Sequence, residues 1–149
     1  MQFALGMAPV ARASHATLVR TPLIVLAEDD ASLRALLAEA LGMDGHRVVQ
    51  VATGSALINA VRQIVIDGAE GGQLALLISD VRMPDLSGID ALKLLRDAEL
   101  CIPIILITAF SDLWTRAEAA RYGARLIDKP LELSVLRRAV REALAPAVD

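Results

Sequence analysis

Cysteine is almost absent from this sequence of 149 residues, which contains Cys101 alone. A single cysteine excludes an intramolecular disulfide and any metal site built from several cysteines, and it is consistent with a reducing compartment. We expect Cys101 to be a small, buried, apolar residue. The only two histidines, His15 and His46, lack the neighbouring ligands of a zinc site, and we expect both at the surface.

Aromatic residues make up only 3% of the sequence, although hydrophobic residues make up 55%. The core must therefore be aliphatic, and few rings remain on which bases or sugars could stack. A formal net charge of −3 gives no general attraction to nucleic acid or to an anionic membrane, so we expect neither as a direct partner. No uninterrupted apolar stretch reaches the roughly 18 residues that a membrane span needs, and we expect a cytoplasmic protein.

The length of the chain suits one domain better than two. Residues 1–21 contain two arginines and no acidic residue, but no charged stretch precedes a long apolar one, as it does in a secretory signal. We expect an N-terminal extension at 1–21, ordered or partly disordered, one domain at 22–145 and a tail at 146–149. Translation from Met7 and excision from a longer protein both remain open alternatives.

From Leu23 onward, short aliphatic runs alternate with amphipathic stretches, the pattern of parallel strands joined by crossover helices. Strands are predicted at residues 23–27, 48–52, 74–79, 104–107 and 125–127. Helices are predicted from 30 to 42 or 45, with Leu36 on the buried face, and at 55–66, 88–98, 112–122 and 133–144. Nearly continuous apolar strands are buried on both faces. We therefore predict a doubly wound α/β fold, a five-stranded parallel sheet of flavodoxin-like order 2-1-3-4-5 with helices on both faces.

Polar residues follow four of the predicted strands, namely Glu28, Asp29 and Asp30, then Asp80, then Thr108, and finally Asp128 and Lys129. The carboxyl ends of parallel strands lie along one edge of a sheet, so carboxylates, a hydroxyl and an ammonium can meet there. Clustered carboxylates raise one another's pKa or recruit a cation, and Mg²⁺ prefers such oxygen ligands. This combination suits phosphoryl transfer, which needs a nucleophile and positive charge around the phosphoryl oxygens.

Each of these signals also has a simpler explanation. Acidic residues are favoured at a helix N-terminus, and Asp80 can simply open the turn that the following Pro, Asp, Ser and Gly form. Lys129 and Thr108 taken singly are ordinary surface and strand-end residues. Their joint placement at one sheet edge favours the chemical interpretation.

In their order along residues 23–144, these motifs resemble the receiver domains of two-component response regulators. The resemblance implies that Asp80, in the segment Asp-Val-Arg-Met-Pro-Asp-Leu-Ser-Gly, is the phosphoacceptor. It implies further that the Mg²⁺ ligands are Glu28, Asp29, Asp80 and the backbone carbonyl of Arg82, and that Thr108 and Lys129 contact the phosphoryl group. Such a domain catalyses its own phosphorylation and dephosphorylation and is a signalling protein rather than an enzyme with an external substrate.

The chain departs from the family pattern at the positions that report phosphorylation. Leu126 stands where the family usually has Tyr or Phe, and the segment between Gly123-Ala124 and Lys129 is one residue short. Residues 67–73 extend the connection before the third strand, most simply as a surface insertion. Arg82 and Phe110 occupy positions that flank the path of the hydrolytic water in similar domains, which predicts slow autodephosphorylation.

The resemblance also implies partners. The phosphoryl donor would be a sensor histidine kinase or a histidine phosphotransfer protein, and a downstream protein or a second copy of the chain would read the face made by the fourth helix, fifth strand and fifth helix. Five arginines are expected on that face, either for an acidic partner or as solvated side chains: Arg116, Arg121, Arg137, Arg138 and Arg141.

Two other functions remain open from the sequence. An inactive receiver-like interaction module is favoured by Leu126 and opposed by the complete set of acids, threonine and lysine. A haloacid-dehalogenase-type phosphatase also uses an aspartate nucleophile, but Arg82 stands where the second acid of its Asp-x-Asp motif belongs. No nucleotide-binding glycine loop is present, so direct use of ATP is not expected.

Overall fold

The computed structural model describes residues 21–67 and 73–146 of the chain. His15, most of the predicted extension at 1–21, the centre of the segment 67–73 and the last three residues of the predicted tail lie outside the described residues. In the described part, strands and helices alternate in the order β1 (Leu23–Ala27), α2 (Ala31–Met43), β2 (Arg47–Val51), α3 (Gly54–Asp67), β3 (Leu74–Asp80), α4 (Gly88–Asp97), β4 (Ile104–Thr108), α5 (Leu113–Arg121), β5 (Arg125–Asp128) and α6 (Leu133–Leu144).

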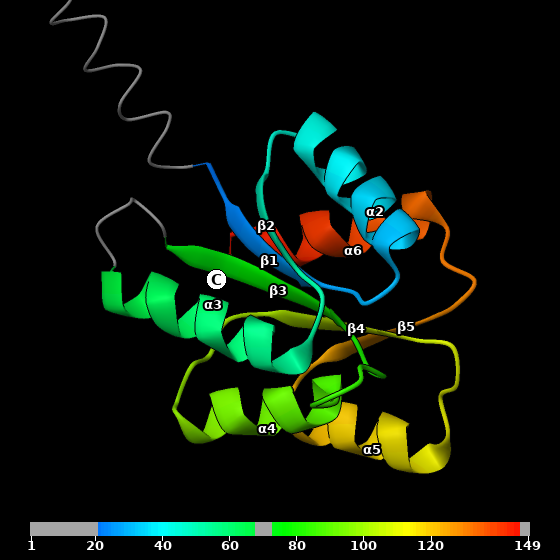
Figure 1. Cartoon of the computed structure of the whole chain (residues 1–149). Helices are drawn as coiled ribbons and strands as arrows, with labels where there is room; N and C mark the ends of the chain where they lie inside the picture. Colours follow the sequence, from blue (N-terminus) through cyan, green and yellow to red (C-terminus); the bar gives the residue numbers. More distant parts are fainter. Residues whose placement is uncertain (1–20, 68–72, 147–149) are drawn as a thin grey trace, which may run out of the picture.

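The strands form one parallel sheet in the order β2-β1-β3-β4-β5. Helices α2 and α6 cover one face of this sheet, and α3, α4 and α5 cover the other (Figure 1). The predicted doubly wound α/β fold is therefore confirmed, with β2 beginning one residue earlier than predicted. Within residues 21–67 and 73–146, no helix is long and apolar enough to cross a membrane.

Alternate residues of the central strands enter two separate cores, as the two-residue period of a strand requires. In β1, Ile24 and Leu26 pack with α2 and α6, whereas Val25 and Ala27 pack with α3 and α4. All five residues of β1 and all five of β4 are buried. Each fully buried Leu, Ile or Val side chain contributes roughly 1.5–3 kcal/mol, so these two strands fix the position of whatever follows them.

The structure corrects some predictions about single residues. Leu36 is 48% exposed because α2 turns Leu37, Ala38 and Leu41 toward the sheet instead. Cys101 is exposed and not buried, because it lies in the connection between α4 and β4. His46 is partly buried rather than fully at the surface, and this burial lowers its pKa.

Candidate functional site

The register of the sheet aligns the polar residues that the sequence placed after the strands. The pairs at this edge are Ala27 with Ser79, Asp80 with Ile107, and Thr108 with Asp128. Because neighbouring strands end at nearly the same level, the residues after β1, β3, β4 and β5 share one edge of the sheet. The prediction that these ends meet is confirmed by the pairing.

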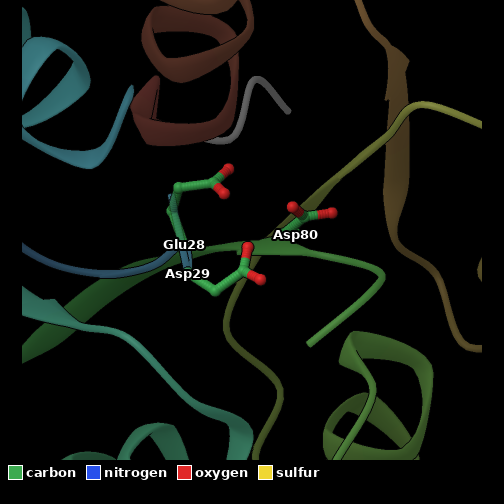
Figure 2. Close-up of side chains that lie close together, drawn as sticks. All are labelled: Glu28, Asp29 and Asp80. Atoms are coloured by element: carbon green, nitrogen blue, oxygen red, sulfur yellow. The ribbon is translucent and has the colours of Figure 1, made fainter. Parts of the chain in front are cut away.

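Three carboxylates converge at this edge (Figure 2). Glu28, Asp29 and Asp80 each have an oxygen that lies within 4.8 Å of an oxygen of each of the other two. Glu28 is only 1% exposed and Asp80 6%, while Asp29 is exposed to solvent. The cluster is therefore mostly withdrawn from water but open on the side of Asp29.

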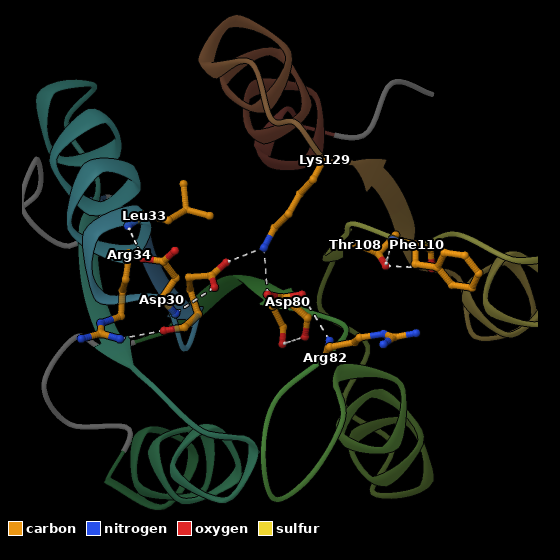
Figure 3. A network of polar contacts seen from close by, with 10 residues as sticks. Asp30, Leu33, Arg34, Asp80, Arg82, Thr108, Phe110 and Lys129 are labelled. Carbon is orange, nitrogen blue, oxygen red and sulfur yellow. Dashed lines mark hydrogen bonds and ion pairs between the residues drawn. The ribbon is translucent and has the colours of Figure 1, made fainter.

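Lys129 supplies positive charge to this cluster (Figure 3). Its Nζ lies 3.0 Å from Oδ2 of Asp80, to which it donates a hydrogen bond, and 3.4 Å from Oε1 of Glu28. Burial acts to lower the pKa of Lys129, but the hydrogen bond and charge of Asp80 together with the charge of Glu28 outweigh this effect and raise the pKa. Lys129 is therefore a charged ammonium at neutral pH.

Glu28 titrates near neutrality. Burial raises its pKa to about 7, with a further increase from the charge of Asp80, although the N–H of Asp30 and the charge of Lys129 favour the carboxylate. The Asp30 N–H donates to Oε2 at 3.1 Å, whereas Oε1 is buried and accepts no hydrogen bond. Oε1 is paired with the Lys129 ammonium at 3.4 Å but accepts no hydrogen bond, so its charge is only partly offset and favours a further cation.

The donor set fits a hard divalent cation such as Mg²⁺. All three side chains offer carboxylate oxygens, and one of these oxygens is buried without a hydrogen bond. Mg²⁺ takes oxygen ligands, needs only one or two carboxylates from the protein and keeps several waters, which the exposed side at Asp29 can admit. This arrangement is typical of the Mg²⁺ site of a receiver domain.

The Arg82 peptide lies beside Asp80, because the Arg82 N–H donates to Oδ1 of Asp80 at 3.2 Å. Its guanidinium stacks over the ring of Phe110, with 5.5 Å between Cζ and the ring centroid. Phe110 is 59% exposed, so this pair lies at the surface. The structure thus brings together the two residues that the sequence linked to the path of water.

Thr108 is fully buried, and its hydroxyl is directed to the backbone of Phe110 (Figure 3). Thr108 Oγ1 donates to the Phe110 carbonyl at 3.1 Å and accepts from the Phe110 N–H at 3.0 Å. The carbonyl of Thr108 accepts from the Lys129 N–H at 2.7 Å, which ties the end of β4 to the residue after β5. Leu126 is partly buried and packs against the core shared with α3, α4 and α5.

Sequence reasoning missed the contacts made by Asp85. Its carboxylate accepts from the N–H groups of Gly54 and Ser55 and from the Ser55 hydroxyl, at the start of α3. The Ser55 hydroxyl is the main cause that lowers the pKa of Asp85 to about 2. Asp85 was interpreted only as a turn residue, because nothing in the local sequence indicates a partner some 30 positions earlier.

Comparison with known proteins agrees with this geometry. The family model "Response regulator receiver domain" matches residues 24–141. The chain is 31% identical over 122 residues to the regulatory protein AtoC of Escherichia coli and 33% identical over 129 residues to the DNA-binding transcriptional regulator NtrC of Azospirillum brasilense. These matches cover 81% and 83% of this chain but only 25% of each relative.

Solved structures show the same likeness. The non-phosphorylated HemR receiver domain of Leptospira biflexa has a TM-score of 0.75 at 27% identity, covering 87% of this chain and 98% of that domain. The signal receiver domain of a LuxO-type repressor from Vibrio parahaemolyticus has a TM-score of 0.71 at 25% identity, covering 83% of this chain and 90% of that domain.

Proposed function

The chain belongs to the response regulator receiver domain family, and from that premise we propose that Asp80 accepts a phosphoryl group from a phosphohistidine of a sensor histidine kinase or histidine phosphotransfer protein. The observation that supports this proposal most is the position of the Asp80 carboxylate, 3.0 Å from Lys129 Nζ and within 4.8 Å of the carboxylates of Glu28 and Asp29. A buried nucleophile flanked by a cation and a metal pocket matches the needs of phosphoryl transfer.

In the proposed reaction, an oxygen of Asp80 forms a bond to phosphorus while the phosphorus–nitrogen bond of the phosphohistidine breaks. The bonding electrons leave with the histidine nitrogen, and the donor imidazole is released. Lys129 stays near the former carboxylate and offsets the charge of the phosphoryl oxygens. Glu28, Asp29, Asp80 and the backbone carbonyl of Arg82 would hold Mg²⁺, which would supply further positive charge to the phosphoryl group.

Hydrolysis reverses the modification. A water molecule attacks phosphorus, the bond between phosphorus and the Asp80 oxygen breaks, and inorganic phosphate and the free carboxylate are formed. The Arg82 N–H donates to the Asp80 carboxylate, and the Arg82 guanidinium stacks on the ring of Phe110. We propose that this pair hinders the water and prolongs the phosphorylated state.

The acyl phosphate carries a charge of roughly −1.5 to −2, in place of the single negative charge of the Asp80 carboxylate. We propose that Thr108 and Lys129 move toward it and change the face formed by α5, β5 and α6. Arg116 of this face pairs with Asp128 at 3.3 Å, and Arg121 lies 3.9 Å from Glu118. Arg137 contacts Asp44 at 3.0 Å on the opposite side of α6, so its assignment to this face was wrong.

The receiver signals through its own contacts, as a free-standing cytoplasmic protein or within a longer chain, to a downstream protein or a second copy. Four arginines are still expected on the face of α5, β5 and α6, and they favour an acidic partner. These are Arg116, Arg121, Arg138 and Arg141.

Incubation with acetyl phosphate and Mg²⁺, followed by intact-mass measurement, tests the proposed function. We expect the mass gain of one phosphoryl group in the wild type and none in Asp80→Asn, which keeps the size of the side chain but lacks the nucleophile. Catalytic turnover of a phosphomonoester would indicate the phosphatase alternative instead. Absence of any modification would indicate an inactive receiver-like module.

A further inference from the structure

We propose that Asp85 is a positioning residue for the cation pocket. It fastens the loop of residues 81–88, which follows Asp80, to the start of α3, and so holds the Arg82 peptide beside the carboxylate cluster. This inference rests on the proposed function, because it assumes that the cluster binds Mg²⁺. It assigns a role to a side chain that does not contact the cluster.

The Asp85 carboxylate uses both oxygens at the start of α3. Oδ1 accepts from the Gly54 N–H at 2.9 Å, and Oδ2 accepts from the Ser55 N–H at 3.1 Å and from the Ser55 hydroxyl. The N-terminus of a helix has unpaired N–H groups and a positive dipole end, and both favour a carboxylate. Asp85 therefore serves as an N-terminal cap contributed from a distant loop, and the contact restrains that loop.

The approach of the loop to α3 is close enough to require glycine. A Cβ atom at Gly54 would overlap the carbonyl oxygen of Leu86 and lie 2.5 Å from the Leu86 Cβ. The backbone of the loop thus rests on the backbone of α3 next to the Asp85 contacts. The tip of the loop is held by hydrogen bonds and by packing together.

The base of the same loop is also fixed. The Gly88 N–H donates to the Val81 carbonyl at 2.8 Å, and a Cβ atom at Gly88 would overlap the carbonyl oxygen of Asp80. The Val81 N–H donates to Ile107 of β4 at 2.8 Å. Arg82 lies between this base and the tip of the loop. The sheet restrains the base, and Asp85 restrains the tip.

The acidic residues after β1 are tied to the same segment. The Glu28 N–H donates to the carbonyl of Val51 at 3.1 Å, and Val51 is only three residues before Gly54. One turn, residues 51–55, therefore holds the Glu28 side of the pocket through Val51 and the Asp80 side through Asp85. Loss of the Asp85 contacts would free the loop from this turn, while the pairing of β1 with β3 would still hold Glu28 near Asp80.

Binding of Mn²⁺, a spectroscopic substitute for Mg²⁺ with the same preference for oxygen ligands, tests the proposal without phosphorylation. We expect Asp85→Ala to weaken Mn²⁺ binding about tenfold, as is typical when support behind a metal ligand is lost. Ser55→Ala removes one of the three contacts and should have a smaller effect, and Asp85→Asn, which keeps an acceptor oxygen, should restore part of the affinity. Electron paramagnetic resonance of free Mn²⁺ measures each affinity.

A matched control is Asp112→Ala, because Asp112 is also an exposed aspartate that caps a helix, here α5 through the Thr115 N–H at 2.8 Å, and its link to the loop is the attraction between its charge and that of Arg82 rather than a hydrogen bond. If Asp85 only caps α3, both alanine variants should lower Tm and leave Mn²⁺ affinity unchanged. If Asp85 positions the loop beside the cation pocket, only Asp85→Ala should bind Mn²⁺ more weakly, and amide hydrogen exchange at Gly54 and Ser55 should be faster in that variant.

Wild-type Mn²⁺ affinity in Asp85→Ala and Ser55→Ala would overturn the proposal, as would a wild-type protein that binds no Mn²⁺. If the wild type binds Mn²⁺ and Asp85→Ala binds it weakly, but Asp80 is never phosphorylated, the proposed function fails and the positioning role of Asp85 stands. The two conclusions are thereby distinguishable.

Discussion

Glu28 is the residue at which protons and a divalent cation compete. Its pKa of about 7 results from burial and from the charge of Asp80, and one of its oxygens accepts no hydrogen bond. A ligand carboxylate must be ionised, so metal affinity depends on pH. The cation pocket should therefore be sensitive to pH within the physiological range.

We predict that Mg²⁺ affinity falls about tenfold between pH 8 and pH 6, because a group with a pKa near 7 is mostly ionised at the first and mostly protonated at the second. Because the pKa of Glu28 is raised to about 7, Mg²⁺ affinity is lost as the pH falls through this value. Titration calorimetry at fixed ionic strength measures this change. Glu28→Gln, which has no proton to lose, should bind weakly with little dependence on pH, and an affinity in the wild type that is constant over this range would contradict the assignment.

Arg82 and Phe110 are predicted to control the lifetime of the phosphorylated state. The Arg82 guanidinium carbon lies 5.5 Å from the Phe110 ring centroid, and the Arg82 N–H donates to Asp80. Arg82→Asn/Phe110→Ala should lose the acyl phosphate several-fold faster than wild type, because water gains access to phosphorus. Decay of phosphorylated protein after removal of the donor gives both rates, and equal rates would disprove the idea.

At the scale of single residues, the sequence predicted the positions of side chains at strand ends. It did not predict contacts between residues that are far apart in the chain. Glu28, Asp29, Asp80 and Lys129 could be placed together because parallel strands end along one edge. The partners of Asp85 could not, since a surface aspartate in a turn has the same local sequence whether or not a distant helix begins beside it.

Among the elements, the connection between β4 and α5 is the one that the proposed switch must change. Thr108 holds it through two hydrogen bonds to Phe110, and Leu126, packed into the core, has no ring to move. If the Thr108 hydroxyl turns to a phosphoryl oxygen, it can no longer donate to Phe110. The start of α5 should then move, and Trp114, the sole tryptophan, lies there.

We predict that beryllofluoride, which mimics the phosphoryl group on Asp80, changes Trp114 fluorescence in the wild type. Trp114 is 57% exposed and Lys93 Nζ lies 5.4 Å from its ring centroid, so a shift of α5 alters its surroundings. Thr108→Val, which keeps the shape but lacks the hydroxyl, should bind beryllofluoride without that change. The same change in both proteins would show that Thr108 does not transmit the signal.

The start of α3 is an element boundary where an extra methyl group should be harmful. Gly54→Ala would force Cβ against Leu86 and should destabilise the protein by about 1–3 kcal/mol. Gly42 lies within α2, and no atom lies within 4 Å of a Cβ placed there. Gly42→Ala should therefore stabilise the protein by about 0.5–1 kcal/mol through helix propensity. Urea unfolding of both variants measures the free energies, and effects of the same sign would refute the comparison.

For the whole molecule, sheet order and layering followed from the sequence because the strands carry nearly uninterrupted apolar runs. Such runs require cover on both faces, and right-handed crossovers then leave few arrangements. The exposure of Leu36 did not follow, because periodicity shows which side of a helix is apolar but not how far the neighbouring elements extend over it. The exposure of Cys101 did not follow either, because Cys101 lies in the connection between α4 and β4, where no periodicity applies.

Cation binding should stabilise the entire fold, because the pocket joins residues from β1 and β3 that separate on unfolding. At about 100 times the dissociation constant, Mg²⁺ should add about 2.7 kcal/mol, which corresponds to roughly 5–10 °C in Tm for a domain of this size. Differential scanning fluorimetry with and without Mg²⁺ measures the shift. Asp29→Ala should reduce it, and an equal shift in that variant would argue against binding at the cluster.

The charges of the pocket, three clustered carboxylates and the ammonium of Lys129, also limit the distance over which the proposed phosphorylation acts electrostatically. The four ionised groups of the pocket have a formal charge of −2, which a bound dication cancels. Conversion of the Asp80 carboxylate to a doubly charged acyl phosphate then adds one negative charge. At physiological ionic strength the field of a single charge is screened within about 8 Å. If Asp80 is phosphorylated as proposed, we expect partners to recognise this state at short range, by the shape of the surface they touch, and not by attraction from a distance.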